Sequence, residues 1–158
     1  MTKEKWKIER FDIEPFEKMP KGLFIGVDPG TVHLGIAVLW ETQVTLYQVS
    51  IARSANPIER MQDAQKIMTE CIHNYSHLAT VCIEGASFAD KYRQVELAEM
   101  RASIAWWGLS KKFRIEILPP NSIRKIVFNN GKLKAHEVWT NIPHDCAAAL
   151  SCALAVSL

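Results

Sequence analysis

One stretch organises the sequence, Phe24-Ile25-Gly26-Val27-Asp28-Pro29-Gly30-Thr31, because an apolar run ends there in an acid and two turn residues. The run from Leu23 to Val27 predicts a buried strand, and Pro29-Gly30 predicts a tight turn after it. The apolar character resumes over Leu34–Leu39, so we expect two adjacent strands joined by this turn. Asp28 then ends a strand, where a carboxylate is costly to bury unless it is protonated, paired or bound to a cation.

The flanking segments alternate between strand and helix patterns. Val44–Val49 predicts a third strand, and Pro57–Tyr75 has the apolar spacing of a helix face with Asn56 as its N-cap. The apolar run Ala79–Ile83 ends at Glu84 and predicts a buried strand parallel to the first. Further expected elements are a helix over Gln94–Leu109, a strand over Arg114–Leu118, a helix capped by Asn121 and ending at Phe128, and a helix over His144–Val156.

This order predicts one α/β domain with a mixed five-stranded sheet, three antiparallel strands followed by two parallel ones, flanked by helices. A length of 158 residues suits a single domain. Residues 1–21 mix charges with single aromatics and contain Pro15 and Pro20, so we expect an N-terminal arm lying on a domain formed by residues 22–158. No run approaches the roughly 18 apolar residues of a membrane span, so we expect no membrane partner.

The four cysteines lie in apolar runs without a Cys-x-x-Cys pair. They are Cys71, Cys82, Cys146 and Cys152. This pattern predicts buried free thiols rather than a disulfide or zinc framework, and hence a reducing compartment. The first 21 residues lack the apolar core of a signal peptide, so we expect a cytoplasmic protein or one from another reducing compartment.

Asp28 and Glu84 end two strands that should be neighbours, and two carboxylates side by side favour a bound cation. Asp145, in the first turn of the last expected helix, is a candidate third oxygen ligand. Hard oxygen ligands favour Mg²⁺ or Mn²⁺ over zinc. Two plainer interpretations stay open: Asp28 is also a turn-former before Pro-Gly, and Asp145 is also a favourable acid at a helix start.

Four segments, in order, resemble the motifs of RuvC-type Holliday-junction resolvases of the RNase H-like superfamily. They are Phe24–Thr31 with Gly35-Ile36-Ala37-Val38, then Val81–Glu84, then Pro119–Lys125 with Gly131 and Lys134, and His144–Leu150. Together they span most of the chain from Leu23 to the C-terminus. The resemblance implies a metal-dependent crossover junction endodeoxyribonuclease, which resolves four-way DNA junctions with two symmetric nicks.

The resemblance also implies the roles of individual residues. Asp28 would bridge two Mg²⁺ or Mn²⁺ ions, Glu84 and Asp145 would complete the clamp, and Lys134 would hold the scissile phosphate. His144 is a further candidate metal ligand. Two-metal hydrolysis of this kind leaves 5′-phosphate and 3′-hydroxyl ends, and the reaction uses no nucleotide cofactor.

One position departs from the family pattern. The family usually carries Asp-x-x-Asp on its last helix, where residues i and i+3 share a face, but the second position here is Ala148. The loss of one acid should weaken a metal site and slow cleavage. Three explanations compete: an engineered inactivation, a natural enzyme that works with three acids, or a relative that has given up cleavage. The Ala-rich ending also resembles YqgF/RuvX-type nucleases, which however lack a strand-end acid equivalent to Glu84.

The segment from Gly85 to Lys134 holds ten Lys or Arg and four Asp or Glu, although the whole chain has a net charge of only +2. A solvated surface is the plain interpretation of this excess, and a DNA-phosphate track is the functional one. Phe88 and Tyr92 are candidates for stacking on an opened base, or for covering the start of the following helix. The candidate phosphate contacts are Lys91, Arg93, Arg101, Lys111, Lys112, Arg124, Lys125 and Lys132.

Two symmetric nicks imply a twofold homodimer, with the helix over Gln94–Leu109 forming much of the interface. Trp106 and Trp107, near its end, belong either to that interface or to the core. The segment between Lys134 and His144 is short for the family, so we expect its helix to be trimmed.

Two other function classes compete with a resolvase. A protein of the same fold that binds junctions without cutting them is supported by Ala148, and the retained acids argue against it. A phosphotransferase of the actin and sugar-kinase type is suggested by Asp28-Pro29-Gly30-Thr31, but such proteins enclose a nucleotide between two domains and this chain provides one.

Overall fold

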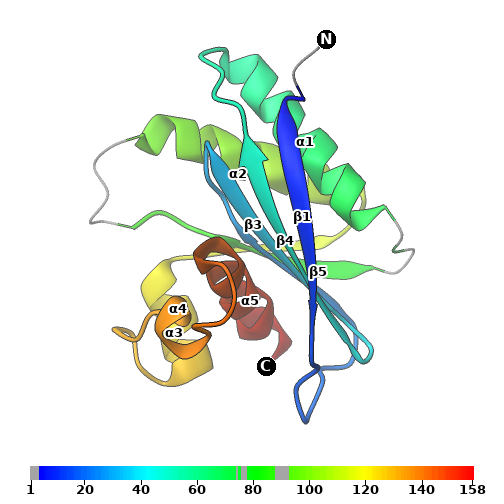
Figure 1. The fold of residues 1–158 in the computed structure, drawn as a ribbon, viewed down its shortest axis with the longest axis vertical. Helices are drawn as coiled ribbons and strands as arrows, with labels where there is room; N and C mark the ends of the chain where they lie inside the picture. The colour runs from blue at the N-terminus through cyan, green and yellow to red at the C-terminus, as the bar shows by residue number, and fades with distance from the viewer. Residues whose placement is uncertain (1–3, 74, 76–77, 88–92) are drawn as a thin grey trace.

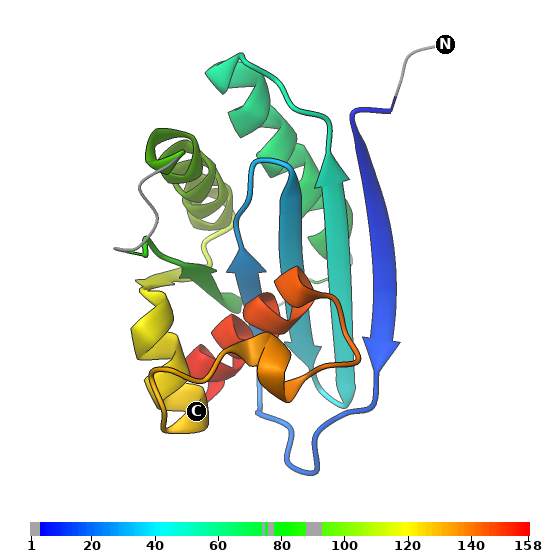
Figure 2. The same ribbon diagram turned by 60° about the vertical axis from the view of Figure 1, so that its left-hand side comes forward.

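The chain folds around one mixed sheet with helices on both of its faces (Figures 1 and 2). The computed structural model describes residues 4–73, 75, 78–87 and 93–158. The strands are β1 (Trp6–Ile13), β2 (Leu23–Asp28), β3 (His33–Trp40), β4 (Gln43–Ile51), β5 (Ala79–Glu84) and β6 (Arg114–Leu118). The helices are α1 (Pro57–Ile72), α2 (Gln94–Ser110), α3 (Pro120–Phe128), α4 (Ala135–Val138) and α5 (His144–Ser157).

The predicted α/β class and strand directions are confirmed. The strand order is β1-β4-β3-β2-β5-β6, with β3 antiparallel to its neighbours β2 and β4, and with β5 and β6 parallel to β2. The predicted number of strands is wrong, because the described part of the chain forms six rather than five. The additional strand, β1, comes from the segment predicted to be an arm.

β1 pairs with β4 along its whole length, from Trp6 opposite Ile51 to Ile13 opposite Val44. Its apolar residues looked irregular in sequence because the strand changes the face that it buries. Trp6 and Ile8 pack on the side of the sheet that α1 covers, whereas Phe11 and Ile13 pack on the side of α5. Pro15 follows the strand and does not interrupt it, so residues 6–13 belong to the domain rather than to an arm.

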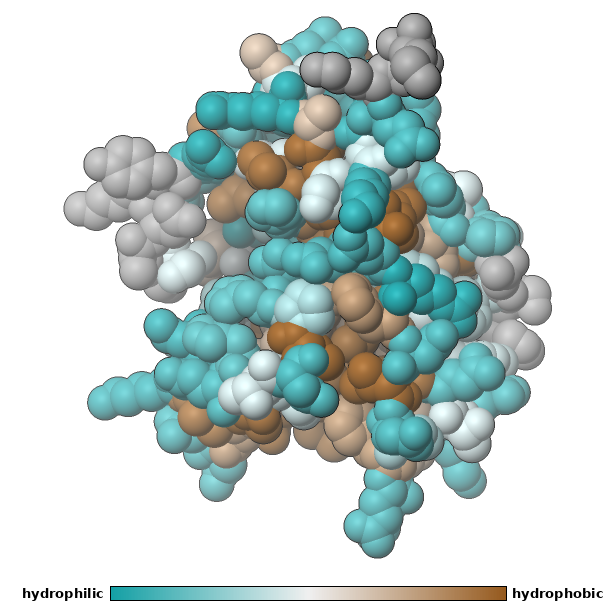
Figure 3. All heavy atoms as spheres, in the orientation of Figure 1, coloured by the Kyte–Doolittle hydropathy of each residue, from teal (hydrophilic) through white to brown (hydrophobic). Residues whose placement is uncertain are grey.

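Two apolar layers hold the sheet between the helices. Ile67 and Met68 of α1 and Ile104 of α2 pack with strand residues such as Ile25 on one face. Leu150 of α5 packs with Leu46 on the other. The surface seen in Figure 3 is correspondingly dominated by hydrophilic side chains, with apolar ones in separate patches. All four cysteines are buried and free.

The helix boundaries follow local chemistry. Asn56 caps α1 as predicted, since its Oδ1 accepts hydrogen bonds from the backbone N–H of Ile58 at 2.9 Å and of Glu59 at 3.4 Å. The prediction of Asn121 as the cap of α3 is wrong: Pro119 holds the cap position, because Pro120 occupies the first turn, where its fixed φ suits a helix. The trimmed helix expected before His144 is α4, with 4 residues. No helix among the described residues is long and apolar enough to cross a bilayer.

Candidate active site

Two carboxylates lie together at one edge of the sheet. β2 and β5 are parallel neighbours in register, with Val27 opposite Ile83, so the next residue of each strand, Asp28 and Glu84, ends at the same edge. Both acids line two adjoining cavities, one of about 160 Å³ and one of about 150 Å³. The prediction that these two strand ends meet is therefore confirmed by the sheet register.

Helix α5 is brought against this edge by two glycines. A Cβ on Gly26 of β2 would collide with the backbone carbonyl of Ala149, and a Cβ on Gly35 of β3 would collide with that of Asp145. Only glycine at these strand positions lets the helix backbone lie directly on the sheet. The close approach places the first turns of α5 beside Asp28.

The rotation of α5 decides which of its residues face the acids. His144, Ala148 and Ser151 line the second cavity, and they are spaced as i, i+4 and i+7 on one helix face. Asp145 lies over Gly35 and lines neither cavity. Its carboxylate is 3.8 Å from Nδ1 of His144, and its charge still acts on both strand-end acids. Asp145 as a metal ligand therefore stays a prediction.

The environment of the two strand-end acids disfavours their charge. Burial raises the pKa of the Asp28 carboxyl well above its usual range, and the charges of Glu84 and Asp145 raise it further, against an opposing effect of Arg101. Burial also raises the pKa of Glu84, and the positive charges of Arg124 and Arg101 offset part of that rise. Two neighbouring, half-buried carboxyl groups with raised pKa values are a setting that a bound cation would stabilise.

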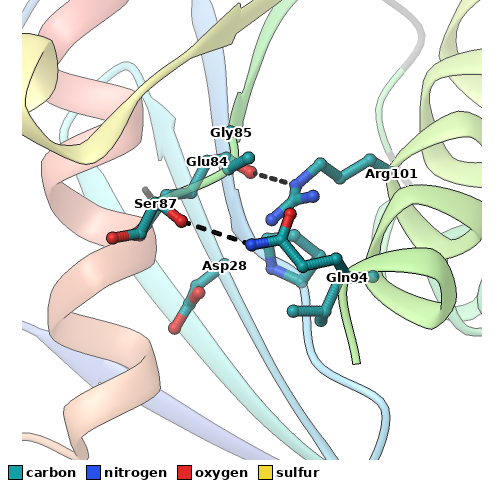
Figure 4. A pocket seen from close by; sticks show the side chains of 9 residues that line it. Asp28, Glu84, Gly85, Ser87, Gln94 and Arg101 are labelled. Atoms are coloured by element: carbon teal, nitrogen blue, oxygen red, sulfur yellow. Dashed lines mark hydrogen bonds between the residues drawn. The ribbon is translucent and has the colours of Figure 1, made fainter. Parts of the chain in front are cut away.

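The first cavity lies between the strand ends and the start of α2 (Figure 4). Arg101 reaches it from α2, and its Nε donates a hydrogen bond to the backbone carbonyl of Glu84 at 2.9 Å. Gln94, in the first turn of α2, donates to the carbonyl of Ser87 at 3.5 Å. Arg101, predicted as one of the DNA contacts, thus lies against the acids and ties α2 to the end of β5.

The second cavity lies between the strand ends, α3 and α5. Arg124 of α3, Lys134 and His136 line it together with His144. The rings of His136 and His144 face one another with centroids 4.3 Å apart. The backbone N–H of Lys134 donates to Oε2 of Glu137 at 2.8 Å, which fixes the residue at the start of α4. This cavity joins the acids to cationic and imidazole side chains.

The other predicted DNA contacts are not gathered at the site. Lys111 and Lys112 follow the far end of α2, a helix of 17 residues and hence about 25 Å long, and Lys111 lies 5.9 Å from the ring centre of Trp107. Arg93, Lys125 and Lys132 are exposed and line neither cavity; they lie directly before α2, on α3 and on the loop after α3. Phe88, Lys91 and Tyr92 lie outside the described residues.

The donor set fits a divalent cation through Asp28 and Glu84. Among the residues that the structure describes, however, no group of three or more His, Cys, Asp or Glu is arranged to hold a metal ion. The two strand-end acids would thus be the principal protein ligands, with His144 and Asp145 nearby.

Sequence reasoning did not single out three residues of these cavities: Gln94, His136 and Ser151. Ser151 could have been predicted from helical spacing, because it lies seven residues after His144 on the same helix face. No sequence pattern indicated His136 or Gln94, since their place at the site depends on how α4 and α2 pack.

Several solved structures resemble this chain, and two of them are RuvC structures. The "Thermus thermophilus RuvC structure" matches with a TM-score of 0.66 and 17% sequence identity, over 85% of this chain and 92% of that one. "T. thermophilus RuvC in complex with Holliday junction substrate" matches with a TM-score of 0.62 and 16% identity, over 87% of this chain and 92% of that one. No protein-family model matches the chain, and no curated protein matches it by sequence.

The mixed sheet, with helices on both faces and acids at its strand ends, is an α/β fold of the RNase H-like kind. More narrowly, the fold is RuvC-like, and the similarity covers most of the chain.

Proposed function

We propose that this protein is a metal-dependent endonuclease that resolves four-way DNA junctions with paired, symmetric nicks. The observation that carries the proposal is the pair of half-buried acids, Asp28 and Glu84, at one sheet edge in a cavity that Arg124 and Lys134 also line. Metal-dependent phosphodiester hydrolysis requires acids that bind the metal ion and, beside them, positively charged side chains that bind the phosphate. The RuvC-like fold, which in one solved case binds a Holliday junction, supports the choice of substrate.

Each residue contributes a separate function in this mechanism. Asp28 and Glu84 would hold Mg²⁺ or Mn²⁺, which when bound supplies Lewis-acid activation of water and of the scissile phosphate. Lys134 and Arg124 would contact the phosphate oxygens and offset the charge that develops during cleavage. Arg101 would keep the end of β5 in place through the Glu84 carbonyl. The two-metal arrangement of the RuvC resemblance needs a fourth acid, and Ala148 stands in that position.

Helix α2 supports a homodimer. Its inward residues Met100, Ile104 and Trp107 are buried, so Trp107 belongs to the core. Its outward side is apolar as well: Val95 is 73% exposed, Trp106 68% and Leu109 54%. With the exposed Ala98 and Ala102, these residues follow one another at intervals of three or four and form a stripe, called here the α2 outer face. A helix that is apolar on both sides is normally covered on both.

We propose a second copy of the chain as the cover of the α2 outer face. A twofold axis beside α2 would give two equivalent sites for the two strands of a junction. Because Arg101 of the same helix contacts the end of β5, such an interface would adjoin the site directly.

The decisive experiment is cleavage of a labelled synthetic four-way junction and of a linear duplex, with Mg²⁺ or Mn²⁺. We expect paired nicks in the junction alone, with 5′-phosphate and 3′-hydroxyl ends. Asp28→Asn should abolish cleavage and leave junction binding intact. Continued cutting by Asp28→Asn would refute the role of the strand-end acids.

One observation favours a second candidate, a junction-binding protein that does not cut. Ala148 lines the second cavity where an acid is expected, and a weakened site is compatible with binding alone. Tight binding of the junction without nicks, by both the native chain and Ala148→Asp, would establish this alternative. Either function needs DNA, so we expect the protein in a reducing compartment that contains DNA: the cytoplasm, an organelle or a phage-infected cell.

A further inference from the structure

The two cavities beside Asp28 and Glu84 differ in chemistry. Among the residues that the structure describes, the first adds to the acids one charged side chain, that of Arg101, whose Nε donates a hydrogen bond to the Glu84 carbonyl. The second adds four nitrogen-bearing side chains. They are Arg124, Lys134, His136 and His144. Within the described part of the chain, the acids that line the second cavity are the two that it shares with the first.

Helix α5 contributes no carboxylate to the second cavity. The residues that it presents there are His144, Ala148 and Ser151, which offer an imidazole, a methyl group and a hydroxyl. Asp145 lines neither cavity, and its backbone carbonyl lies over Gly35. A divalent cation of the Mg²⁺ type needs charged oxygen ligands, and a second one must also overcome the repulsion of the first. The second cavity lacks the ligands for this.

The same surroundings suit an anion. A guanidinium and an ammonium group are the side chains that bind phosphate oxygens most strongly, and the cavity is lined by one residue of each kind, Arg124 and Lys134. Arg124 lines this cavity together with Asp28 and Glu84, so its positive charge lies beside the two acids. Arg124 therefore stands where a second cation would otherwise balance the acids.

We propose that this site binds one divalent cation, held by Asp28 and Glu84, and that the second cavity receives a phosphate group of the DNA directly on Arg124 and Lys134. The inference rests on the proposed nuclease function and concerns how that function is carried out here. Arg124 takes over the charge-balancing role that a second metal ion has in a four-acid site. Ala148 fits this arrangement, because an acid at this position would repel the phosphate.

The first test counts bound ions without DNA. Mn²⁺ binding to the full chain, followed by electron paramagnetic resonance of the free ion, should show one site per chain. Ala148→Asp should raise the number to two. Asp28→Asn should remove the site. Two sites of similar affinity in the native chain would overturn the single-cation inference and leave the nuclease proposal standing, whereas no binding at all would overturn both.

The second test concerns Arg124 and does not depend on Ala148→Asp folding. Arg124→Gln should bind Mn²⁺ at least about threefold more tightly, because a positive charge near Glu84 is removed. The same variant should lose binding of inorganic phosphate, measured by the broadening of its ³¹P resonance by bound Mn²⁺. A merely structural role for Arg124 would weaken both.

Lys66→Gln is the matched control. It also removes one positive charge, but from an exposed position on α1, on the opposite side of the sheet from α3 and α5. Its Mn²⁺ and phosphate affinities should equal those of the native chain. Unchanged or weaker Mn²⁺ binding by Arg124→Gln, measured against this control, would refute the role assigned to Arg124.

Discussion

Trp106→Ala tests whether the α2 outer face is a subunit interface. Trp106 is 68% exposed on the single chain, and a tryptophan side chain presents about 150–250 Å². Covering the exposed part would then remove about 100–170 Å² from water, which is worth about 2.5–4 kcal/mol per subunit at about 25 cal/mol per Å². Both subunits contribute a tryptophan, although part of this gain offsets the entropy lost on association.

If the lower value of about 2.5 kcal/mol is counted for one subunit alone, the dissociation constant of the dimer should rise at least about 50-fold in Trp106→Ala. Sedimentation equilibrium over a range of chain concentrations measures this constant. The melting temperature of the monomeric form should barely change, because the side chain makes few contacts within its own chain. This separates a lost interface from a damaged fold.

Ile126→Ala is the control for this experiment. Ile126 is 45% exposed and lies on α3, on the other face of the sheet, so its removal should leave the dissociation constant unchanged. An equal constant for Trp106→Ala and the native chain, or a native chain that stays monomeric at about 100 µM, would refute the reasoning.

Three further outcomes follow from the packing and the charges. Gly26→Ala should lower the free energy of unfolding, measured in urea, by about 1–3 kcal/mol, because a Cβ at this position would collide with the backbone of α5. In the control Gly131→Ala, the new Cβ would first meet the flexible Lys125 side chain at 3.3 Å, so the free energy of unfolding should fall less. Equal losses in the two variants would contradict the close approach of α5. In metal-free buffer Asp28→Asn should become increasingly more stable than the native chain as the pH rises. Burial raises the pKa of Asp28 in the folded state. The contribution of the protonated carboxyl to the stability of the fold is therefore complete below the unfolded-state pKa of about 4, and it is lost as the pH rises through the folded-state pKa. A difference in unfolding free energy between the two proteins that stays constant across this pH range would refute the assignment. Mg²⁺ at about 100 times its dissociation constant should stabilise the native chain by about 2.7 kcal/mol and leave Asp28→Asn unaffected, as thermal unfolding would show; equal shifts in both would place the cation elsewhere.

Some features could be predicted from the sequence because they depend on neighbours along the chain. The apolar run that ends at Asp28 and the one that ends at Glu84 each specify a buried strand, and parallel pairing brings their ends to one edge. The cap of α1 is equally local, since the Asn56 side chain bonds to N–H groups two and three residues away.

β1 shows why other features could not be predicted. Its apolar residues change from one face of the sheet to the other between Ile8 and Phe11, so no simple alternation marks the strand. The change is favourable only because different layers, one including α1 and one including α5, cover the two halves. A strand shows an alternating apolar pattern along its whole length only if it buries the same face throughout. β1 buries one face in its first half and the other face in its second half.

Arg101 illustrates the same limit at the site. Its charge and position in a basic segment predicted a contact with DNA, which stays a prediction, but did not predict that Arg101 lines the acid cavity and donates a hydrogen bond to the Glu84 carbonyl. The direction of a side chain from a helix that is apolar on both sides depends on which side packs inward, and composition alone does not settle that.

Strand pattern, turn chemistry and charge are properties of adjacent residues, so the strand-end acids, the basic segment and the α/β order of one small domain could be predicted from the sequence. Which residues of α5 face those acids depends on tertiary packing. Spacing pairs Asp145 with Ala148, whereas close packing on Gly26 and Gly35 rotates the helix so that His144, Ala148 and Ser151 point into the cavity. That rotation is fixed by contacts between segments more than a hundred residues apart, which no local pattern encodes.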